Sequence, residues 1–546
     1  MKNVWLSKAV DDPDLIPELQ SVWDDAEAVN DRFYRELEFG TGGLRGVIGA
    51  GTNRMNIYTV RQATQGLADY INGNGVVKKV AIGHDSRNKS ALFAREAARV
   101  LAANGIQPWL YNRLVPTPVV SWGVRHLQCG AGICVTASHN PAIYNGYKVY
   151  GADGCQITTD AASKIQAAIK SVDPFAVKVA DTGINTVPEQ TLDAFIEAVL
   201  AQRVESAAPA ALKVVYTPLN GAGLECVTRA LKAAGYADVH VVPSQEKPDG
   251  NFPTCPYPNP EERAAMAEGL KLCAELTPDL LIATDPDCDR VGIAVVENGD
   301  YKLLTGNEVG ALLLDYICRR RLELNRMPKN PVAVKTIVTS ELTARVAEHY
   351  NVELRDVLTG FKFIGEQIGL LEAAGEANRY IFGFEESYGY LSGPHVRDKD
   401  AVNASLMICD MAAWYKSQNI TLAAALDDLY ARFGYCANSL DSFAFPGEAG
   451  LKDMQNVMKS LRSAPPKAIQ GYIVTEFRDY ITPFKPGFPS SDVLQLLFED
   501  GTLITARPSG TEPKLKIYYS VTREDAEAAK AVTEDYRKAV KRVIGL

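Results

Sequence analysis

The sequence lacks paired cysteines, long apolar runs and any excess of positive charge. Its 10 cysteines are scattered and none forms a CxxC pair, so we expect reduced thiols and no cysteine-bound metal. No apolar run approaches the roughly 20 residues that span a bilayer, and the first residues carry no signal-peptide core. The net charge of −9 repels nucleic acid and anionic membrane surfaces. We therefore expect a cytoplasmic protein with neither nucleic-acid nor membrane partners.

What the chain does contain is enough apolar material for several cores. At 546 residues it is too long for one domain, and 47% hydrophobic with 23% charged residues is ordinary for a globular protein. An apolar strand, a Gly-rich loop and an amphipathic helix recur along it. The strands lie at 80–83, 214–216 and 333–338, and their helices at 90–103, 223–234 and 340–350. This alternation predicts α/β units.

Three segments interrupt this pattern and divide the chain. We interpret the irregular stretches 173–188, 319–331 and 439–450 as linkers. Beyond the last one, charged helical runs alternate with short strands, which is an α+β texture. We expect four domains, at residues 1–180, 181–322, 323–440 and 441–546.

A serine beside a histidine follows one of the apolar strands. Residues 131–135 are apolar, and Thr136-Ala137-Ser138-His139-Asn140-Pro141 comes directly after them. Ser138 is a candidate nucleophile and His139 a candidate proton carrier. Tyr144-Asn145-Gly146-Tyr147 is typical of a hairpin turn, and its return strand would bring Lys148 back toward Ser138. Taken alone, the pair gives weak support for catalysis.

A carboxylate-rich loop follows a second apolar strand, at 279–283. The loop reads Thr284-Asp285-Pro286-Asp287-Cys288-Asp289-Arg290, and alternate residues of extended chain point the same way. Three carboxylates would then converge at the carboxyl end of a strand, a place where α/β proteins bind ligands. Oxygen ligands of this kind suit Mg²⁺. The alternative is a solvated acidic turn, whereas the spacing of an EF-hand Ca²⁺ loop is missing.

Two later loops offer groups for an anion and for hydroxyls. Ala506-Arg507-Pro508-Ser509-Gly510-Thr511-Glu512-Pro513 combines a guanidinium, two hydroxyls and a glycine, as a phosphate cradle would. Gly383-Phe384-Glu385-Glu386-Ser387-Tyr388-Gly389-Tyr390 offers carboxylates, which bind vicinal sugar hydroxyls well. Their ordinary alternatives are a proline-bounded turn and an acidic helix cap.

Three weaker motifs complete the set. Lys362, within residues 358–365, could act as acid, base or phosphate contact, although a lone lysine is usually a solvated surface residue. Residues 39–46 are dense in glycine, which allows close approach to a ligand, and Arg45 is their only cation. Gly83-His84-Asp85-Ser86-Arg87 ends a strand.

Together, six motifs resemble those of the α-D-phosphohexomutases, a family that includes phosphoglucomutases and phosphomannomutases. They occur in the family's order over nearly the whole chain: FGTGGLRG, TASHNP with NGYK, DPDCDR, TGFKFIG, GFEES and RPSGTEP. The variants FGFEESYGYL and VRDKDAV are most similar to bacterial α-phosphoglucomutases. The resemblance implies a heart-shaped, four-domain protein with three related α/β domains and a C-terminal α+β domain.

The resemblance also assigns roles to individual residues. Ser138 would carry a phosphate and, with Asp285, Asp287 and Asp289, hold one Mg²⁺ per chain. Arg290 would neighbour the transferred group, and Glu385 and Ser387 would bind sugar hydroxyls. Thr359 and Gly360 would contribute to substrate binding, and Arg507, Ser509, Gly510 and Thr511 would hold the distal phosphate. The candidates for proton transfer and charge stabilisation are His139, Lys148, Lys362 and Arg45, and the motifs do not choose the base.

The implied reaction is an intramolecular phosphotransfer that isomerises glucose 1-phosphate and glucose 6-phosphate. It would pass through phosphoserine and glucose 1,6-bisphosphate, which would also prime the enzyme. The partners would be small sugar phosphates, and the chain a monomer or weak homodimer. Tyr388 and Gly389 stand where dual-specificity relatives often have Gly-His, which argues against efficient use of mannose phosphate. Pro286 and Cys288 also depart from the common pattern.

Several alternatives stay open at the level of sequence. A phosphatase or phosphotransferase with an aspartate nucleophile would phosphorylate Asp285 and leave Ser138 dispensable. A catalytically inactive sugar-phosphate sensor would not need the serine and all three aspartates that are present. Within the family, phosphomannomutase, phosphopentomutase and glucose 1,6-bisphosphate synthase are the close alternatives.

Overall fold

The protein was analysed as a computed structural model that describes residues 2–40, 42–204, 209–445, 447–482, 488–509 and 514–545. The chain forms two compact units, each assembled from separate stretches: the first holds Met1–Gly306 and Phe361–Leu422, the second Asn307–Gly360 and Ala423–Leu546. The bounds of the four expected domains stay a prediction. Among the described helices, none combines the length and apolar character needed to cross a membrane.

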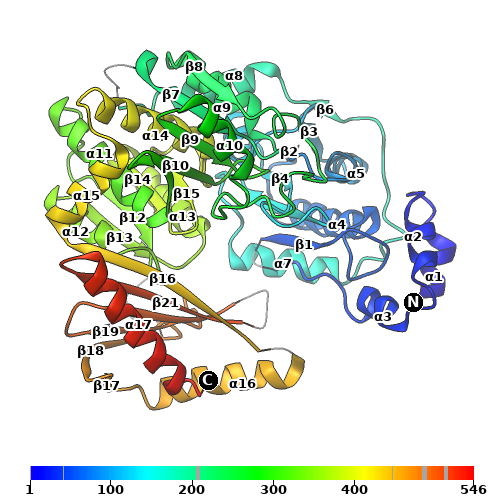
Figure 1. Cartoon of the computed structure of the whole chain (residues 1–546). Helices are drawn as coiled ribbons and strands as arrows, with labels where there is room; N and C mark the ends of the chain where they lie inside the picture. The colour runs from blue at the N-terminus through cyan, green and yellow to red at the C-terminus, as the bar shows by residue number, and fades with distance from the viewer. Residues whose placement is uncertain are drawn as a thin grey trace. The chain divides into compact units, whose positions relative to one another are not determined.

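A mixed six-stranded sheet organises the first part of the first unit (Figure 1), in the order β1-β5-β4-β2-β3-β6. Strands β4, β2, β3 and β6 run parallel to one another. Strand β5 pairs antiparallel with β4, and β1 pairs antiparallel with β5 at the edge of the sheet. The strands are β1 (Gly43–Val47), β2 (Lys79–His84), β3 (Gln107–Leu110), β4 (Ala131–Val135), β5 (Tyr144–Gly151) and β6 (Asn185–Thr186). The helices around them are α4 (Ile57–Gly73), α5 (Ser90–Ala103), α6 (Thr117–His126) and α7 (Thr159–Ile169).

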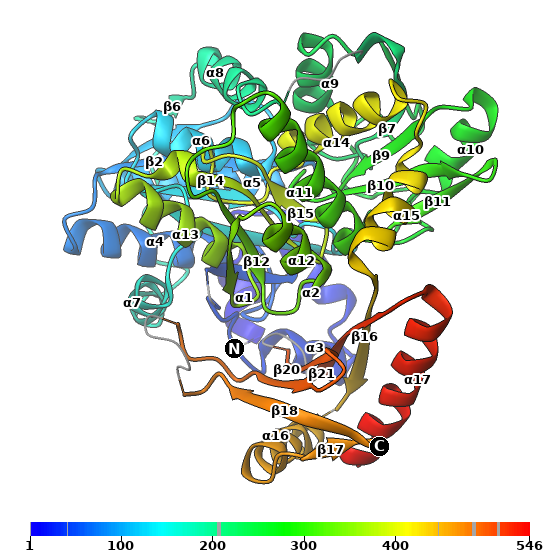
Figure 2. The ribbon, with the colours of Figure 1, turned by 90° about the vertical axis from the view of Figure 1, so that its left-hand side faces the viewer.

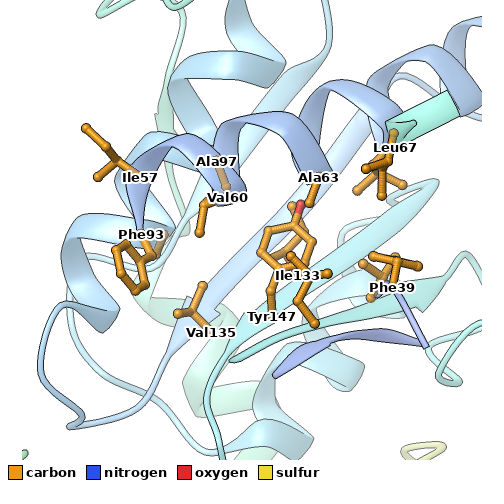
Figure 3. Close-up of a cluster of buried hydrophobic side chains, with 14 of the residues drawn as sticks. Phe39, Ile57, Val60, Ala63, Leu67, Phe93, Ala97, Ile133, Val135 and Tyr147 are labelled. Atoms are coloured by element: carbon orange, nitrogen blue, oxygen red, sulfur yellow. The ribbon is translucent and has the colours of Figure 1, made fainter. Parts of the chain in front are cut away.

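Helix α4 shows why this sheet has a stable core. Asn56 caps it, because its side chain accepts hydrogen bonds from the amides of Tyr58 and Thr59. Figure 3 shows its apolar side chains above those of β4 and β5, at helical spacing. The facing side chains are Ile57, Val60, Ala63 and Leu67 on the helix, and Ile133, Val135 and Tyr147 on the strands. Every residue of β4 is buried, as expected for a strand inside an α/β layer.

A five-stranded sheet follows in the same unit, in the order β11-β10-β9-β7-β8. Strands β7, β8 and β9 are parallel, whereas β10 and β11 form antiparallel hairpins. The strands are β7 (Lys213–Thr217), β8 (Asp238–Val241), β9 (Leu280–Thr284), β10 (Val291–Glu297) and β11 (Asp300–Leu304). The accompanying helices are α8 (Glu189–Leu200), α9 (Gly223–Ala233) and α10 (Ala267–Leu276), with a 3₁₀ turn, η1 (Pro209–Ala211).

The remaining elements of the first unit lie at its two ends in sequence. Helices α1 (Lys2–Lys8), α2 (Leu15–Ser21) and α3 (Ala26–Phe33) precede the first sheet. Trp5 of α1 is buried against Phe33, Tyr58 and Phe175. The later elements are α13 (Phe361–Ala373), η2 (Ala377–Arg379), β14 (Tyr380–Glu385), β15 (Gly389–Leu391) and α14 (Ala401–Lys416).

The second unit contains a parallel strand pair. It also contains an antiparallel sheet, which Figure 2 shows. Its first stretch has α11 (Gly306–Glu323), β12 (Val332–Thr336), α12 (Leu342–His349) and β13 (Glu353–Val357). Helix α15 (Leu422–Phe433) leads to the antiparallel sheet, ordered β16-β21-β20-β19-β18-β17. Its strands are β16 (Tyr435–Ala444), β17 (Ala468–Ile469), β18 (Tyr472–Asp479), β19 (Leu494–Phe498), β20 (Leu503–Pro508) and β21 (Lys514–Arg523). Helices α16 (Gly447–Ser463) and α17 (Ala526–Val543) share one apolar core with it.

The structure confirms the α/β alternation and corrects three local expectations. Helices α5, α9 and α12 fall where the pattern placed them, within two residues. The segment 439–450 is no linker, because β16 continues to Ala444, and α11 covers the start of the segment 319–331. Asn145 and Gly146 form no turn either but lie inside β5. A Cβ on Gly146 would meet the Thr136 carbonyl oxygen at 2.4 Å, so this glycine permits close strand approach.

Truncating the core beneath α4 should destabilise the first unit selectively. Ile133→Ala removes a side chain that is 0% exposed, and we expect a loss of about 2–5 kcal/mol. All 5 tryptophans lie in this unit, so the change should appear in denaturant unfolding followed by tryptophan fluorescence. Ile143→Ala, at a position 59% exposed, is the matched control, with an expected change within about 0.5 kcal/mol. Equal losses in both variants would contradict this packing.

Candidate active site

The three aspartates of the acidic loop converge at the tip of the β9–β10 hairpin. Asp285, Asp287 and Asp289 are buried, and each offers an oxygen such that all three lie within 4.8 Å of one another. A turn brings the three aspartates together, and not the extended chain that the sequence predicted. The Cys288 amide donates to the Asp285 carbonyl oxygen at 2.8 Å, and Cys288 takes a positive φ of 53°. Asp285 then accepts the amides of Asp289 and Arg290 at 3.0 and 2.9 Å.

Ser138 lies directly against this cluster. It follows β4 in a left-handed conformation with φ of 52°, and its Oγ donates to Asp285 Oδ2 at 2.7 Å. Its amide donates to Thr136 Oγ1 at 2.8 Å. The His139 Nδ1 atom is 3.2 Å from Ser138 Oγ. Two loops about 150 residues apart in sequence thus meet at one hydroxyl, as the motifs predicted.

Two lysines and a threonine hold the other two aspartates. Lys148 of β5 contacts Asp287 Oδ2 at 2.8 Å and Asp289 Oδ2 at 3.1 Å. Lys399 reaches Asp289 Oδ2 at 3.2 Å. At the start of α6, Thr117 donates through Oγ1 to Asp287 Oδ2 at 2.9 Å and through its amide to the Asp287 carbonyl. The sequence alone gave no role to Lys399 or Thr117. The segment VRDKDAV could have indicated Lys399, and no motif indicated Thr117.

Burial and these contacts shift the pKa values of the aspartates in opposite directions. Burial raises the pKa of Asp285 well above its ordinary range, and the charges of Asp287 and Asp289 raise it further. Burial also works against the charged form of Asp287, but Lys148 outweighs it and lowers the pKa of that carboxyl. Both carboxylates raise the pKa of Lys148 despite its burial. These shifts favour the protonated form of Asp285 and the charged forms of Asp287 and Lys148.

His139 is neutral under ordinary conditions. Burial, followed by the nearby charges of Arg290 and Arg45, lowers its pKa from 6.5 to about 2. Arg290 itself is anchored to Glu261, with Nη1 donating to Oε1 at 2.8 Å. Arg45 lies on β1 next to β5 and is exposed. The imidazole beside Ser138 is thus a weak proton acceptor.

The donor set fits a divalent cation. Within the described residues, Asp287 Oδ1 and Asp289 Oδ1 are buried without a hydrogen-bond partner, an expensive state for carboxylate oxygens. A cation between them and Asp285 would satisfy these atoms, and a set made only of oxygens suits a hard ion such as Mg²⁺. Asp285, Asp287 and Asp289 would hold such an ion, next to Ser138 Oγ.

The first unit also contains the expected sugar loop and Lys362. Glu385 is buried at the end of β14, and Ser387 is half-buried in the turn before β15. The Tyr388 carbonyl accepts the Val291 amide at 3.0 Å, which ties this turn to the strand that follows the acidic loop. Lys362 opens α13 and is half-buried, and burial lowers its pKa.

The other expected site residues belong to the second unit. Thr359 and Gly360 end its first stretch, and Gly360 has a positive φ of 123°. Arg507 is on β20, and the Ser509 amide donates to the Lys514 carbonyl at 2.8 Å. Gly510 and Thr511 lie outside the described residues.

Comparison with known proteins identifies the family of the chain. Successive parts of the chain match the alpha/beta/alpha domains I, II and III and the C-terminal domain of phosphoglucomutase/phosphomannomutase, at residues 36–175, 193–299, 305–433 and 453–538. The chain belongs to the phosphoglucomutase/phosphomannomutase family, as its motifs predicted. The third of these domains has residues in both compact units.

Individual relatives are similar over nearly their whole length. A phosphoglucomutase of Staphylococcus aureus (strain bovine RF122 / ET3-1) is 37% identical over 538 residues, which is 95% of each chain. A phosphoglucomutase/phosphomannomutase family protein from Burkholderia thailandensis matches with a TM-score of 0.71 at 19% identity, over 92% of this chain and 97% of that one. An N-acetylphosphoglucosamine mutase of Aspergillus fumigatus, in complex with GlcNAc-6P and magnesium, matches with a TM-score of 0.52 at 14% identity. The match covers 96% of this chain and 99% of that one.

The neutral His139 should make stability depend on pH. The pKa of His139 in the folded protein lies below its unfolded value of 6.5. Its contribution to the free energy of unfolding is therefore complete above pH 6.5 and is lost as the pH falls toward 2. Between about pH 7.5 and about pH 5, the free energy of unfolding should fall by up to about 2 kcal/mol more in the wild type than in His139→Gln. Urea unfolding at each pH measures the difference.

An exposed histidine in the same unit provides the control for this comparison. His126→Gln, at the end of α6, should keep the pH dependence of the wild type. If His139→Gln keeps it too, the imidazole is not held neutral by its surroundings.

Proposed function

We propose that the chain interconverts glucose 1-phosphate and glucose 6-phosphate through a phosphoserine at Ser138 and a glucose 1,6-bisphosphate intermediate. The observation that carries this proposal is the Ser138 hydroxyl, held at 2.7 Å from an aspartate in a buried acidic cluster. A hydrolytic Ser-His pair would need an acid partner for the histidine and would not need three carboxylates. The name of the Staphylococcus relative supports glucose phosphates as substrates.

The phosphoryl group moves between two oxygens in each half-reaction. In the first, the bond from phosphorus to Ser138 Oγ breaks, a bond to a sugar oxygen forms, and the sugar hydroxyl gives up a proton while Ser138 Oγ gains one. In the second, the bond from the other phosphorus to its sugar oxygen breaks, a bond to Ser138 Oγ forms, and the serine hydroxyl gives up a proton while that sugar oxygen gains one. Phosphoryl transfer depends mainly on positioning and charge stabilisation. This suits a site in which Lys148 is charged and His139 is a weak acceptor.

Positive charge surrounds the path of the transferred group. We assign charge stabilisation to Lys148, Lys399 and Arg290, which all contact the acidic cluster or its loop. Asp285, Asp287 and Asp289 would bind one Mg²⁺ per chain, with an oxygen of the Ser138 phosphate as a further ligand. When bound, the ion would offset negative charge on the transferred phosphate. The magnesium in the Aspergillus fumigatus relative supports this choice of ion.

The resemblance of the motifs assigns the binding of the sugar and of the distal phosphate to further residues. Glu385 and Ser387 would bind hydroxyls, with Lys362 and Arg45 near the charged groups of substrate. Thr359, Gly360, Arg507, Ser509, Gly510 and Thr511 would complete the binding of substrate and its non-reacting phosphate. Either phosphate must be able to react, so the bisphosphate has to reverse its orientation between the two half-reactions. Glucose 1,6-bisphosphate would also prime unphosphorylated enzyme.

Alternative sugars within the family are phosphomannose and phosphopentose. Tyr388 follows Ser387 in the sugar turn and favours glucose over mannose, by the resemblance to bacterial relatives. For assembly and location we propose a monomer or weak homodimer in the cytoplasm. The 10 cysteines support a reducing compartment, because all of them are free and buried.

A coupled mutase assay tests the function directly. With Mg²⁺ and bisphosphate primer, glucose 1-phosphate should be converted faster than mannose 1-phosphate or ribose 1-phosphate. Ser138→Ala should lower the rate to background, because it removes the oxygen that carries phosphate. Ser163→Ala, an exposed serine on α7, is the control and should keep the wild-type rate. Turnover that survives in Ser138→Ala would favour an aspartate nucleophile instead.

Binding of the metal should stabilise the first unit in the absence of substrate. At 100 times its dissociation constant, Mg²⁺ should raise the free energy of unfolding by about 2.7 kcal/mol. Asp287→Asn should abolish this gain, because it removes one ligand charge and a buried unpaired oxygen. Asp193→Asn changes an exposed aspartate on α8 and should keep the full gain. An equal response of both variants would place the cation elsewhere.

A further inference from the structure

Arg87 is a buried arginine that binds the loop of the reactive serine. It follows β2, and because β2 and β4 are parallel neighbours, the loops at their carboxyl ends lie side by side. Its Nη1 donates to the carbonyl oxygens of Pro141 and Tyr144 at 2.9 and 3.1 Å. Its Nη2 donates to the carbonyl oxygens of Ser138 and Asn140. One guanidinium therefore holds four carbonyls of the segment 138–144.

The guanidinium is itself fixed from two other directions. Asp85 Oδ2 lies 3.4 Å from Arg87 Nε, and Asp85 Oδ1 accepts the Arg87 amide at 2.9 Å. The ring of Phe252 stacks against the guanidinium at 5.0 Å. Phe252 is buried and comes from the segment between β8 and α10, in the part of the chain that matches family domain II. The arginine thus joins the serine loop to the acidic-loop domain.

Ser138 needs such restraint because its backbone conformation is unfavourable. With φ of 52° it lies in the left-handed region, where a residue with a Cβ is strained. Three contacts fix its polar groups: Thr136 Oγ1 accepts its amide, Asp285 accepts its hydroxyl and Arg87 binds its carbonyl. The carbonyl contact holds the loop without occupying the hydroxyl. Like the amide contact with Thr136, it does not involve the oxygen that is phosphorylated.

We infer that Arg87 is a positioning residue for phosphoryl transfer, which holds the Ser138 loop in the strained conformation that aims Oγ at the acidic cluster. It acts through the backbone of Ser138 and touches neither sugar nor phosphate. This inference rests on the proposed function. A merely structural arginine would affect folding but leave the chemistry of folded molecules unchanged.

Arg87→Lys tests the inference, because lysine keeps the charge but cannot reach four carbonyls from one planar group. At a temperature where the variant is folded by circular dichroism, we expect kcat to fall about 100-fold, as for a displaced reacting group. KM should change by less than about threefold, because no substrate contact is lost. The rate of labelling of Ser138 from ³²P-labelled glucose 1,6-bisphosphate should fall with kcat.

Arg61→Lys is the matched control. Arg61 on α4 is equally buried and forms ion pairs with Glu96 and Asp11, away from the serine loop. It should lose stability and keep kcat and labelling rate within about twofold, since positioning of the serine is unaffected. If Arg87→Lys behaves like this control, Arg87 is structural and the inference is wrong.

A second pair of variants covers the case in which Arg87→Lys fails to fold. Phe252→Leu removes the aromatic face behind the guanidinium and keeps all charges, and kcat should fall about 3- to 10-fold. Phe93→Leu, in the core on α5, makes the same change without an arginine contact and should leave kcat unchanged. Equal kcat in the two phenylalanine variants would overturn the inference. Failure of the wild type to isomerise any sugar phosphate would instead reject the proposed function, while Ser138 labelling could still be compared among the variants.

Discussion

Repulsion among three buried carboxylates is the constraint on which the rest of this site depends. Three aspartates whose oxygens lie within 4.8 Å would cost several kcal/mol each if all were charged and unpaired. Lys148 and Lys399 offset this repulsion, and burial with the neighbouring carboxylates raises the pKa of Asp285, which favours its protonated form. Among the residues that the structure describes, no hydrogen-bond partner reaches the buried Asp287 Oδ1 and Asp289 Oδ1. The same positive groups suit a phosphorylated serine. The positive groups that stabilise the buried carboxylates are thus the same groups that would stabilise a phosphate on Ser138.

The fold supplies this arrangement from segments far apart in the chain. Ser138 follows β4, Lys148 lies on β5, and the aspartates occupy the hairpin after β9. The start of α6 adds Thr117, and the segment before α14 adds Lys399. Strands β4 and β9 belong to different sheets, and the loops that follow them meet where Ser138 donates to Asp285. The strained Ser138 and Cys288 backbones lie at this meeting point, where surrounding contacts can hold them.

Most of the α/β pattern could be predicted because apolar periodicity and turn residues act locally. Two of the local predictions that were wrong fail for a shared physical reason. Asn145-Gly146 is a strong turn signal, but in this protein both are buried in β5, where Asn145 bonds Asn88 and Ser90 and Gly146 allows close approach. Residues 439–444 resemble a linker in composition, yet pairing with β21 makes them a strand. Neighbours that are distant in sequence outweighed local preference in both cases.

The sequence by itself determined the family, the α/β class and the chemical character of each loop, because these depend on residue types in short, ordered motifs. Only the tertiary structure decided which groups share a site and in what state. Lys399 and Arg87 lie in short motifs that gave neither residue a role, and their roles follow from contacts with Asp289 and with the Ser138 loop. The neutral state of His139 likewise comes from burial and two arginines, and no spacing in the sequence encodes it.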